Sequence, residues 1–207
     1  MTDYAAFREL SPTTLSDLLT RDHVMDIGVR PLWQEMPRVA GPAYTVRCPA
    51  GDHLMVHAAI YRAAPGSVIV VESGDVNYAL AGGNVCAVAQ RHGIAAFVLD
   101  GAVRDIAESR ARGFPIFGRG VIPIPGAKDQ LGSLHETVRC GGVEVAPGDI
   151  VVGDEEGIVV VPKARAPEIL EAAQKKARKD ASLTLDEWEE NHRARIDEIL
   201  RKKGFAG

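Results

Sequence analysis

Two short segments of the chain combine glycines or charged side chains in a pattern that could do chemistry. The first is Gly82-Gly83-Asn84, and the second runs from Asp100 to Glu108. Glycines let a backbone approach a ligand closely, and free N–H groups at the start of a helix favour an anion such as a carboxylate or a phosphate. We therefore expect Gly82, Gly83 and Asn84 to bind an anionic group.

The second segment carries one guanidinium and two carboxylates, from Arg104, Asp105 and Glu108. On a helix, residues three and four positions apart share one face, so these side chains could converge. Two carboxylates could hold Mg²⁺ or Mn²⁺, with waters completing the coordination shell, beside an anionic substrate. The same residues also describe an ordinary capped helix in solvent. The spacing alone leaves both interpretations open.

Alternating strands and helices must position these segments. Residues 67–72 and 95–99 are short apolar runs rich in β-branched side chains, typical of strands buried on both faces. Helices are expected at about 84–92 and 103–112. This alternation predicts a parallel sheet, and ligands of such sheets collect outside the carboxyl ends of the strands. Both segments should therefore meet at that edge.

The remaining pattern predicts an α/β fold of the β/β/α kind, with a parallel-rich central sheet, a β-hairpin layer and a C-terminal helical tail. A strand is expected at 39–46 and a helix at 52–63, capped by Asp52. Strands at 143–152 and 157–161 should form a hairpin. Helices at 164–179 and 183–203 follow, the last with a capping box at Thr184 and Glu187. We assign residues 1–179 to a catalytic domain and 180–207 to the tail.

Length and composition exclude several classes of protein. The chain has 207 residues, 46% of them hydrophobic and 25% charged, which suits one compact domain with a helical appendage. A net charge of −4 without a basic face argues against nucleic acid as a partner. No apolar run could span a bilayer, and no signal-peptide pattern is visible. Three widely spaced cysteines, Cys48, Cys86 and Cys140, suit buried thiols in a reducing cytoplasm. We expect a cytoplasmic protein without a membrane partner.

The spacing of the charged residues resembles that of a known family. Gly83, twenty intervening residues, Arg104-Asp105, two residues and Glu108 match the G-x20-R-D-x2-E/D pattern of the RraA-like family. That family includes the regulator of ribonuclease activity A and the 4-hydroxy-4-methyl-2-oxoglutarate aldolases. Residues 98–105 and 147–157 are also similar to family segments. The resemblance covers about residues 15–172.

This resemblance implies a swivelling β/β/α fold, assembled as a homotrimer or hexamer. It also implies a pyruvate aldolase that depends on Mg²⁺ or Mn²⁺. Such an enzyme cleaves 4-hydroxy-4-methyl-2-oxoglutarate or 4-carboxy-4-hydroxy-2-oxoadipate and also decarboxylates oxaloacetate. Both reactions would pass through a metal-stabilised pyruvate enolate. The partner would then be a small 2-oxo acid: pyruvate, oxaloacetate or a larger pyruvyl aldol.

The resemblance also assigns roles to the catalytic residues. Asp105 would ligate the metal directly, Glu108 would hold the metal's waters, and Arg104 would contact the keto oxygen of the pyruvyl unit. Backbone N–H groups near Gly82, Gly83 and Asn84 would bind its carboxylate. Some aldolases of the family carry Asp where this chain has Gly83. We expect Glu108 to take the place of that missing acid.

Two other functions compete with the aldolase. A metal-free regulator that binds ribonuclease E could keep the fold, but the presence of all three charged residues favours the enzyme. Methyl transfer to a quinone is disfavoured because the chain has no glycine-rich loop that could bind S-adenosylmethionine. A Schiff-base mechanism is disfavoured because neither segment contains a lysine.

Several further residues leave alternatives open. His53 and His57 are four apart and could bind zinc, but no HExxH motif or third ligand accompanies them, so a packed or exposed pair is favoured. Asp75 and Asn77 follow a strand end, where they either line the pocket or form the turn. Asp100, at the next strand end, is a further candidate for the pocket. The apolar stripe of the tail packs either on its own domain or on a neighbouring subunit. From a neighbour, the tail carboxylates could complete the site: Asp186, Glu187, Glu189 and Glu190.

Overall fold

The computed structural model describes residues 4–205, and the chain forms two compact units, Met1–Ala173 and Gln174–Gly207. The boundary lies inside the helix α6 (Ala166–Ala181). The first turns of α6 bury Ala166, Ile169 and Ala173. The boundary between the two compact units therefore lies within this helix, whereas the boundary expected from the sequence lies near its end, at residue 179.

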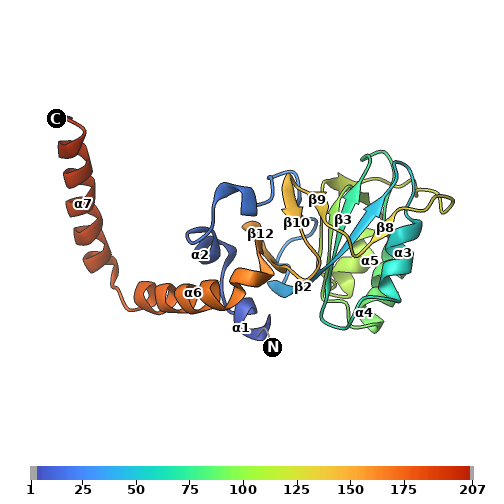
Figure 1. Ribbon diagram of the computed structural model, residues 1–207, viewed down its shortest axis with the longest axis horizontal. Coiled ribbons are helices and arrows are strands. Elements are labelled where there is room, and N and C mark those ends of the chain that lie inside the picture. Colours follow the sequence, from blue (N-terminus) through green and yellow to red (C-terminus); the bar gives the residue numbers. More distant parts are fainter. Residues whose placement is uncertain (1–3, 206–207) are drawn as a thin grey trace. The chain divides into compact units, whose positions relative to one another are not determined.

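A mixed sheet organises the first unit (Figure 1). Within the described residues it has eight strands in the order β1-β6-β4-β3-β2-β11-β12, with β8 paired to β2. The four strands β2, β3, β4 and β6 run parallel, which confirms the predicted parallel sheet, and their neighbours pair antiparallel. The strands are β1 (Arg30–Pro31), β2 (Val39–Cys48), β3 (Val68–Ser73), β4 (Ala96–Asp100), β6 (Ile116–Gly118), β8 (Ser133–Leu134), β11 (Ile150–Asp154) and β12 (Gly157–Val161).

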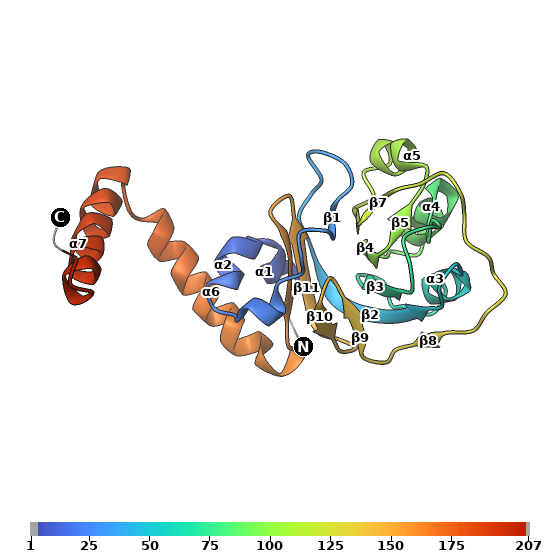
Figure 2. The same cartoon turned by 90° about the horizontal axis from the view of Figure 1, so that it is seen from above.

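Both faces of the parallel strands are buried. Ile69 and Val71 of β3 pack in one apolar cluster with residues of three helices: α3 (Leu54–Ile60), α4 (Gly83–Arg91) and α5 (Ile106–Ala111). The alternating residues Val68 and Val70 pack on the opposite face, against the strand pair β9 (Val138–Cys140) and β10 (Val143–Val145). Figures 1 and 2 show α3, α4 and α5 gathered on one side of the sheet.

Several short elements also belong to the first unit. The helices α1 (Tyr4–Arg8) and α2 (Pro12–Ser16) precede the sheet, and the side chain of Ser11 caps α2 by accepting from Thr14 N. The strands β5 (Ala102–Val103) and β7 (Gly120–Val121) form a small parallel pair, and η1 (Arg21–His23) and η2 (Lys163–Arg165) are short 3-10 helices. The hairpin expected near the C-terminal end of the sheet is confirmed by the pairing of β11 with β12. Its first strand is shorter than expected, because residues 143–145 pair with β9 instead.

The helix expected at 103–112 begins three residues later than the sequence suggested. Residues 102 and 103 form β5, and the helix α5 starts at Ile106. Asp105 precedes it with a left-handed backbone, φ 55° and ψ 37°. The expectation that Arg104, Asp105 and Glu108 share one helical face is therefore wrong, because the first two lie before the helix.

The second unit contains the helix α7 (Leu185–Lys202), and its predicted capping box is confirmed. The Thr184 hydroxyl accepts from Glu187 N at 3.3 Å, and the Glu187 carboxylate accepts from Thr184 N at 2.9 Å. None of the residues of α7 is buried. Across residues 4–205, no helix has the length and apolar character needed to cross a membrane.

Candidate active site

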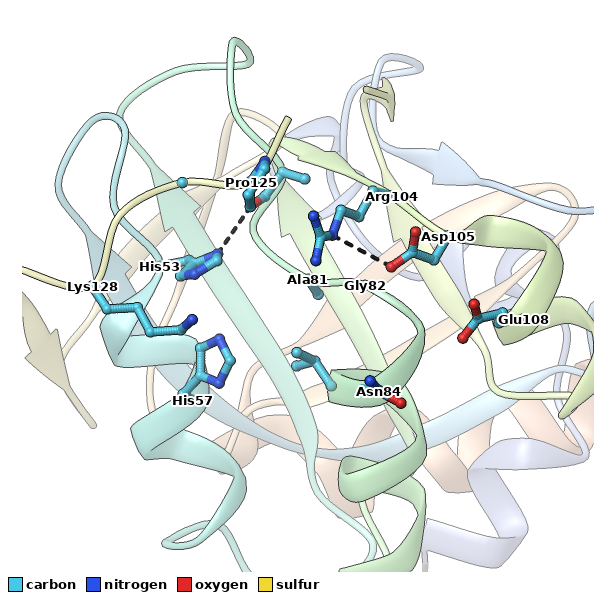
Figure 3. A pocket seen from close by; sticks show the side chains of 13 residues that line it. His53, His57, Ala81, Gly82, Asn84, Arg104, Asp105, Glu108, Pro125 and Lys128 are labelled. Atoms are coloured by element: carbon cyan, nitrogen blue, oxygen red, sulfur yellow. Dashed lines mark hydrogen bonds and ion pairs between the residues drawn. The ribbon is translucent and has the colours of Figure 1, made fainter. Parts of the chain in front are cut away.

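A cavity of about 210 Å³ lies beyond the carboxyl ends of the parallel strands (Figure 3). The segments that follow β2, β3 and β4, together with the loop between β7 and β8, surround it. This is the edge at which ligands of parallel sheets collect. The cavity is lined by His53, His57, Ala79, Ala81, Gly82, Asn84, Val85, Arg104, Asp105, Glu108, Pro125, Gly126 and Lys128.

Backbone hydrogen bonds bring the two segments of the sequence motif together. Leu80 N donates to Ala102 O at 2.9 Å, and Arg104 N donates to Ala81 O at 3.0 Å. These bonds align the chain before α4 with the chain before α5. Gly83 N then donates to the Asp105 carboxylate at 3.1 Å. The twenty residues between Gly83 and Arg104 thus form most of α4 and all of β4, and they bring the chain back beside the segment that precedes α4.

Arg104 and Asp105 form an ion pair that faces the cavity. Arg104 Nε lies 3.4 Å from Asp105 Oδ2, and the two side chains are 41% and 40% exposed. A carboxylate has two oxygens, and the bonds to Arg104 and Gly83 both use Oδ2. Both charged groups therefore remain accessible to a ligand.

The carboxylates of Asp105 and Glu108 pack closely on the two glycines. A Cβ at Gly83 would collide with Glu108 Oε2 and lie 2.6 Å from Glu108 Cδ. A Cβ at Gly82 would lie 2.5 Å from Asp105 Oδ2. The Glu108 carboxylate thus occupies the space that a side chain at position 83 would enter.

The first turn of α4 offers backbone donors to the cavity. Cys86 N is bonded to Gly82 O, whereas the N–H groups of Asn84 and Val85 have no acceptor among residues 4–205. Both residues line the cavity. Such free N–H groups at a helix start attract anions.

Two histidines form another part of the wall. His53 Nδ1 lies 3.0 Å from Ala79 O, and the rings of His53 and His57 have centroids 4.8 Å apart. Burial lowers the pKa of His53. Burial, with the nearby His53 ring and the charge of Lys128, lowers the pKa of His57 to about 4. Both rings are therefore neutral near pH 7.

The sequence did not place these histidines, or Lys128, at the site. His53 and His57 follow the carboxyl end of β2, so the strand-end rule that placed the other segments could have found them. Lys128 lies in the loop between β7 and β8 without a local motif. The cavity therefore contains a lysine, although neither motif segment does, so a Schiff base is not excluded by the lack of a lysine in those segments.

Two candidates from the sequence do not line this cavity. Asp75 Oδ1 accepts from Asn77 N at 2.6 Å, which is a turn contact. Asp100 contacts Arg119 Nε and accepts from Gly141 N at 2.8 Å. Arg119 also binds Asp26 at 2.9 Å. Asp100 therefore ties together distant loops, because its carboxylate turns toward Arg119 instead of the cavity.

The donor set limits which metal could bind. No group of three or more His, Cys, Asp or Glu side chains able to hold a metal occurs in the described part of the chain. His53 and His57 thus have no third protein ligand there, unlike a closed zinc site. Asp105 and Glu108 offer two carboxylates, which suits Mg²⁺ or Mn²⁺ completed by water and substrate.

Comparison with known proteins gives the family. The model of the RraA-like family, described as Aldolase/RraA, matches residues 12–160. The chain belongs to the RraA-like family. A protein of Halalkalibacterium halodurans is 42% identical over 175 residues, which cover 84% of this chain and 83% of the relative. That relative carries the provisional name 4-hydroxy-4-methyl-2-oxoglutarate aldolase.

Solved RraA-like structures share the fold. The RNA-processing inhibitor RraA from Thermus thermophilis is 30% identical with a TM-score of 0.67, over 74% of this chain and 93% of that one. Streptomyces coelicolor RraAS2, titled an unusual member of the RNase ES inhibitor RraA protein family, is 28% identical with a TM-score of 0.70. The match covers 94% of this chain and 100% of that one. The family and the mixed α/β fold expected from the sequence are confirmed.

Proposed function

We propose that this protein is a divalent-metal-dependent pyruvate aldolase that cleaves 4-hydroxy-4-methyl-2-oxoglutarate or a related 4-hydroxy-2-oxo acid. Oxaloacetate decarboxylation would be a second activity of the same site. The observation that carries the proposal is the convergence of Arg104, Asp105 and Glu108 with the start of α4 on one cavity. The provisional name of the Halalkalibacterium halodurans relative supports the same reaction.

The pyruvyl unit common to these substrates has a carboxylate next to a keto group. The free N–H groups of Asn84 and Val85 would bind the carboxylate. The Arg104 guanidinium would donate to the keto oxygen, and its charge would stabilise the negative charge that develops there. Asp105 orients the guanidinium through the contact at Nε.

Asp105 and Glu108 would hold the divalent cation. When bound, the cation supplies positive charge that stabilises an enolate oxygen better than the ground-state keto oxygen. Glu108 packs on Gly83 and faces the cavity from α5, so its carboxylate would replace the acid that some relatives carry at the glycine position.

The two reactions differ in one demand on the protein. In both, a bond to C3 breaks, and its electrons form the enolate of pyruvate. Decarboxylation of oxaloacetate releases CO₂ and removes no proton in this step. Retro-aldol cleavage must also remove the proton of the C4 hydroxyl, so it needs a base.

Pyruvate release from both substrates tests the proposal directly. We expect turnover with Mg²⁺ or Mn²⁺, loss of turnover in EDTA and recovery when metal is added back. Asp105→Asn should lower both activities by at least about 100-fold, because it removes the charge and keeps the shape of the side chain. Metal-independent turnover, full activity of Asp105→Asn, or turnover of neither substrate would refute the proposal.

A regulator that binds ribonuclease E is the second candidate. The similarity to the Thermus thermophilis protein titled an RNA-processing inhibitor supports it. A pull-down with purified ribonuclease E tests this function. Tight binding together with no turnover of either 2-oxo acid would replace the aldolase with the regulator.

A further inference from the structure

The imidazole of His53 has a polar atom that the protein itself does not satisfy. His53 is 6% exposed and lines the cavity, yet its Nε2 has no hydrogen-bond partner in the part of the chain that the structure describes. A buried polar atom without a partner costs free energy, so such atoms are rare in folded proteins. At a cavity wall, an unpaired nitrogen indicates a position for a ligand group.

The other ring nitrogen determines which kind of group that is. A backbone carbonyl can only accept, so Nδ1 carries the proton in the 3.0 Å contact with Ala79 O. Nε2 of the neutral ring then bears a lone pair. Burial lowers the pKa of His53, and the positive charges of Lys128 and Arg104 act in the same direction, so the ring stays neutral. Nε2 is therefore a buried acceptor, which pairs with an O–H group once the ring shifts to meet it.

His57 is a weaker candidate for the same role. Its Nε2 is also unpaired, but no hydrogen bond among the described residues fixes the tautomer of its ring. His57 is also less buried than His53. The ring of His53 is thus the one held in a defined state.

The two histidines lie across the cavity from the charged groups of the sequence motif. Figure 3 shows His53 and His57 across from Arg104, Asp105 and Glu108. A pyruvyl unit bound at Arg104 and the start of α4, with its C3 and C4 carbons directed across the cavity, would reach toward the opposite wall. The hydroxyl on C4 would then approach the histidines.

We propose that His53 is the general base of retro-aldol cleavage, an assignment that rests on the proposed function. His53 Nε2 takes the proton of the C4 hydroxyl as the C3–C4 bond breaks. The O–H electrons form the new C4 carbonyl, and the C3–C4 electrons form the pyruvate enolate. C3 takes one proton from water, and the imidazolium returns its proton to the hydroxide left behind. No proton is gained or lost overall.

This role separates the two activities of one site. Oxaloacetate carries no hydroxyl whose proton must leave, so its decarboxylation does not use His53. A change at His53 should therefore act on one reaction and spare the other. Decarboxylation serves as an internal measure of folding, metal binding and pyruvyl binding.

His53→Asn is the test, because the asparagine amide can keep the contact with Ala79 O but cannot act as a base. We expect kcat/KM for 4-hydroxy-4-methyl-2-oxoglutarate to fall by roughly 100-fold or more. Oxaloacetate decarboxylation in the same preparation should stay within about threefold of the unchanged protein. His57→Asn, a matched change on the same wall, should leave the ratio of the two activities nearly unchanged.

Other outcomes would overturn the assignment. An equal loss of both activities in His53→Asn would mean a structural role, and no loss would mean that another group takes the proton. A selective loss in His57→Asn instead would move the role to His57. If the unchanged protein decarboxylates oxaloacetate but does not cleave the aldol, no base is needed and the assignment fails. If it shows neither activity, the proposed function itself is refuted.

Discussion

At the scale of single residues, Gly83 and Glu108 compete for one space. A methyl group at position 83 would collide with the end of the Glu108 side chain. That side chain is flexible, so we expect Gly83→Ala to fold and to displace the carboxylate from the cavity. The activity should fall by about 10- to 100-fold, as expected for a carboxylate that supports a metal.

A double-mutant cycle distinguishes this effect from a general loss of stability. Once Glu108→Ala has removed the carboxylate, Gly83→Ala should cost little more, so the two effects should not add. Gly120→Ala is the matched control, because a Cβ there meets no atom within 4 Å. Additive effects, measured as kcat/KM for oxaloacetate, would contradict this account.

The lowered pKa of His57 predicts that the stability of the protein changes with pH. Its pKa falls from 6.5 to about 4 on folding, so the unfolded chain takes up a proton first as the pH decreases. The contribution of neutral His57 is therefore complete above pH 6.5 and is lost as the pH falls toward 4. As the pH falls from about 7 to about 5, the free energy of unfolding in urea should decrease less for His57→Gln than for the unchanged protein. Parallel pH curves would rule out this role.

At the scale of elements, Asp52 joins the start of α3 to the loop that carries Lys128. Its carboxylate accepts from Leu54 N at 2.8 Å, Asp129 N at 2.7 Å and Gln130 N at 3.0 Å. Burial alone would raise the pKa of Asp52, but these three donors outweigh it and hold the pKa below its usual value. The loop is thus fixed by a charged group that is 2% exposed.

Removing this carboxylate should destabilise the fold. We expect Asp52→Ala to lower the free energy of unfolding by about 2–4 kcal/mol, because three N–H donors lose a charged acceptor. Denaturant unfolding measures the change. The exposed neighbour Asp129→Ala keeps its backbone N–H and should change stability by less than about 0.5 kcal/mol. Equal effects of the two substitutions would show that the contacts of Asp52 contribute little.

At the scale of the whole molecule, α7 exposes an apolar stripe. Leu185, Trp188, Ile196 and Ile199 are all exposed, and the Trp188 ring stacks on His192. Exposed apolar groups gathered on one face mark interaction surfaces. We therefore expect a second copy of the chain to cover this stripe in the homotrimer or hexamer that the family resemblance implies.

Light scattering of the full chain tests this assembly. The unchanged protein should show a mass three or six times that of the 22.2 kDa chain. Trp188→Ala combined with Ile196→Ala should shift the mass toward smaller species at low concentration. Arg193→Ala, which removes a side chain on the same helix that lies 3.7 Å from Glu189, should not. A monomeric mass of the unchanged protein would contradict the expected assembly.

The sequence was sufficient where local chemistry dictates local structure. The β-branched run at 67–72 predicted a strand buried on both faces, and β3 is one. Thr184 and Glu187 predicted a capping box, which requires only one helical turn and is present. The motif of Gly83, Arg104, Asp105 and Glu108 also pointed to one sheet edge, because parallel strands bring their carboxyl ends together.

Tertiary structure decided what depends on contacts between distant segments. Backbone pairing with residues 80 and 81 keeps Arg104 and Asp105 out of the helix that their own segment favours. Asp100 binds Arg119, nineteen positions away, instead of the cavity. Lys128 comes from a loop that no local pattern connects to the motif. Which side chains face one cavity depends on packing across the whole sheet, and this information is not present in any short stretch of sequence.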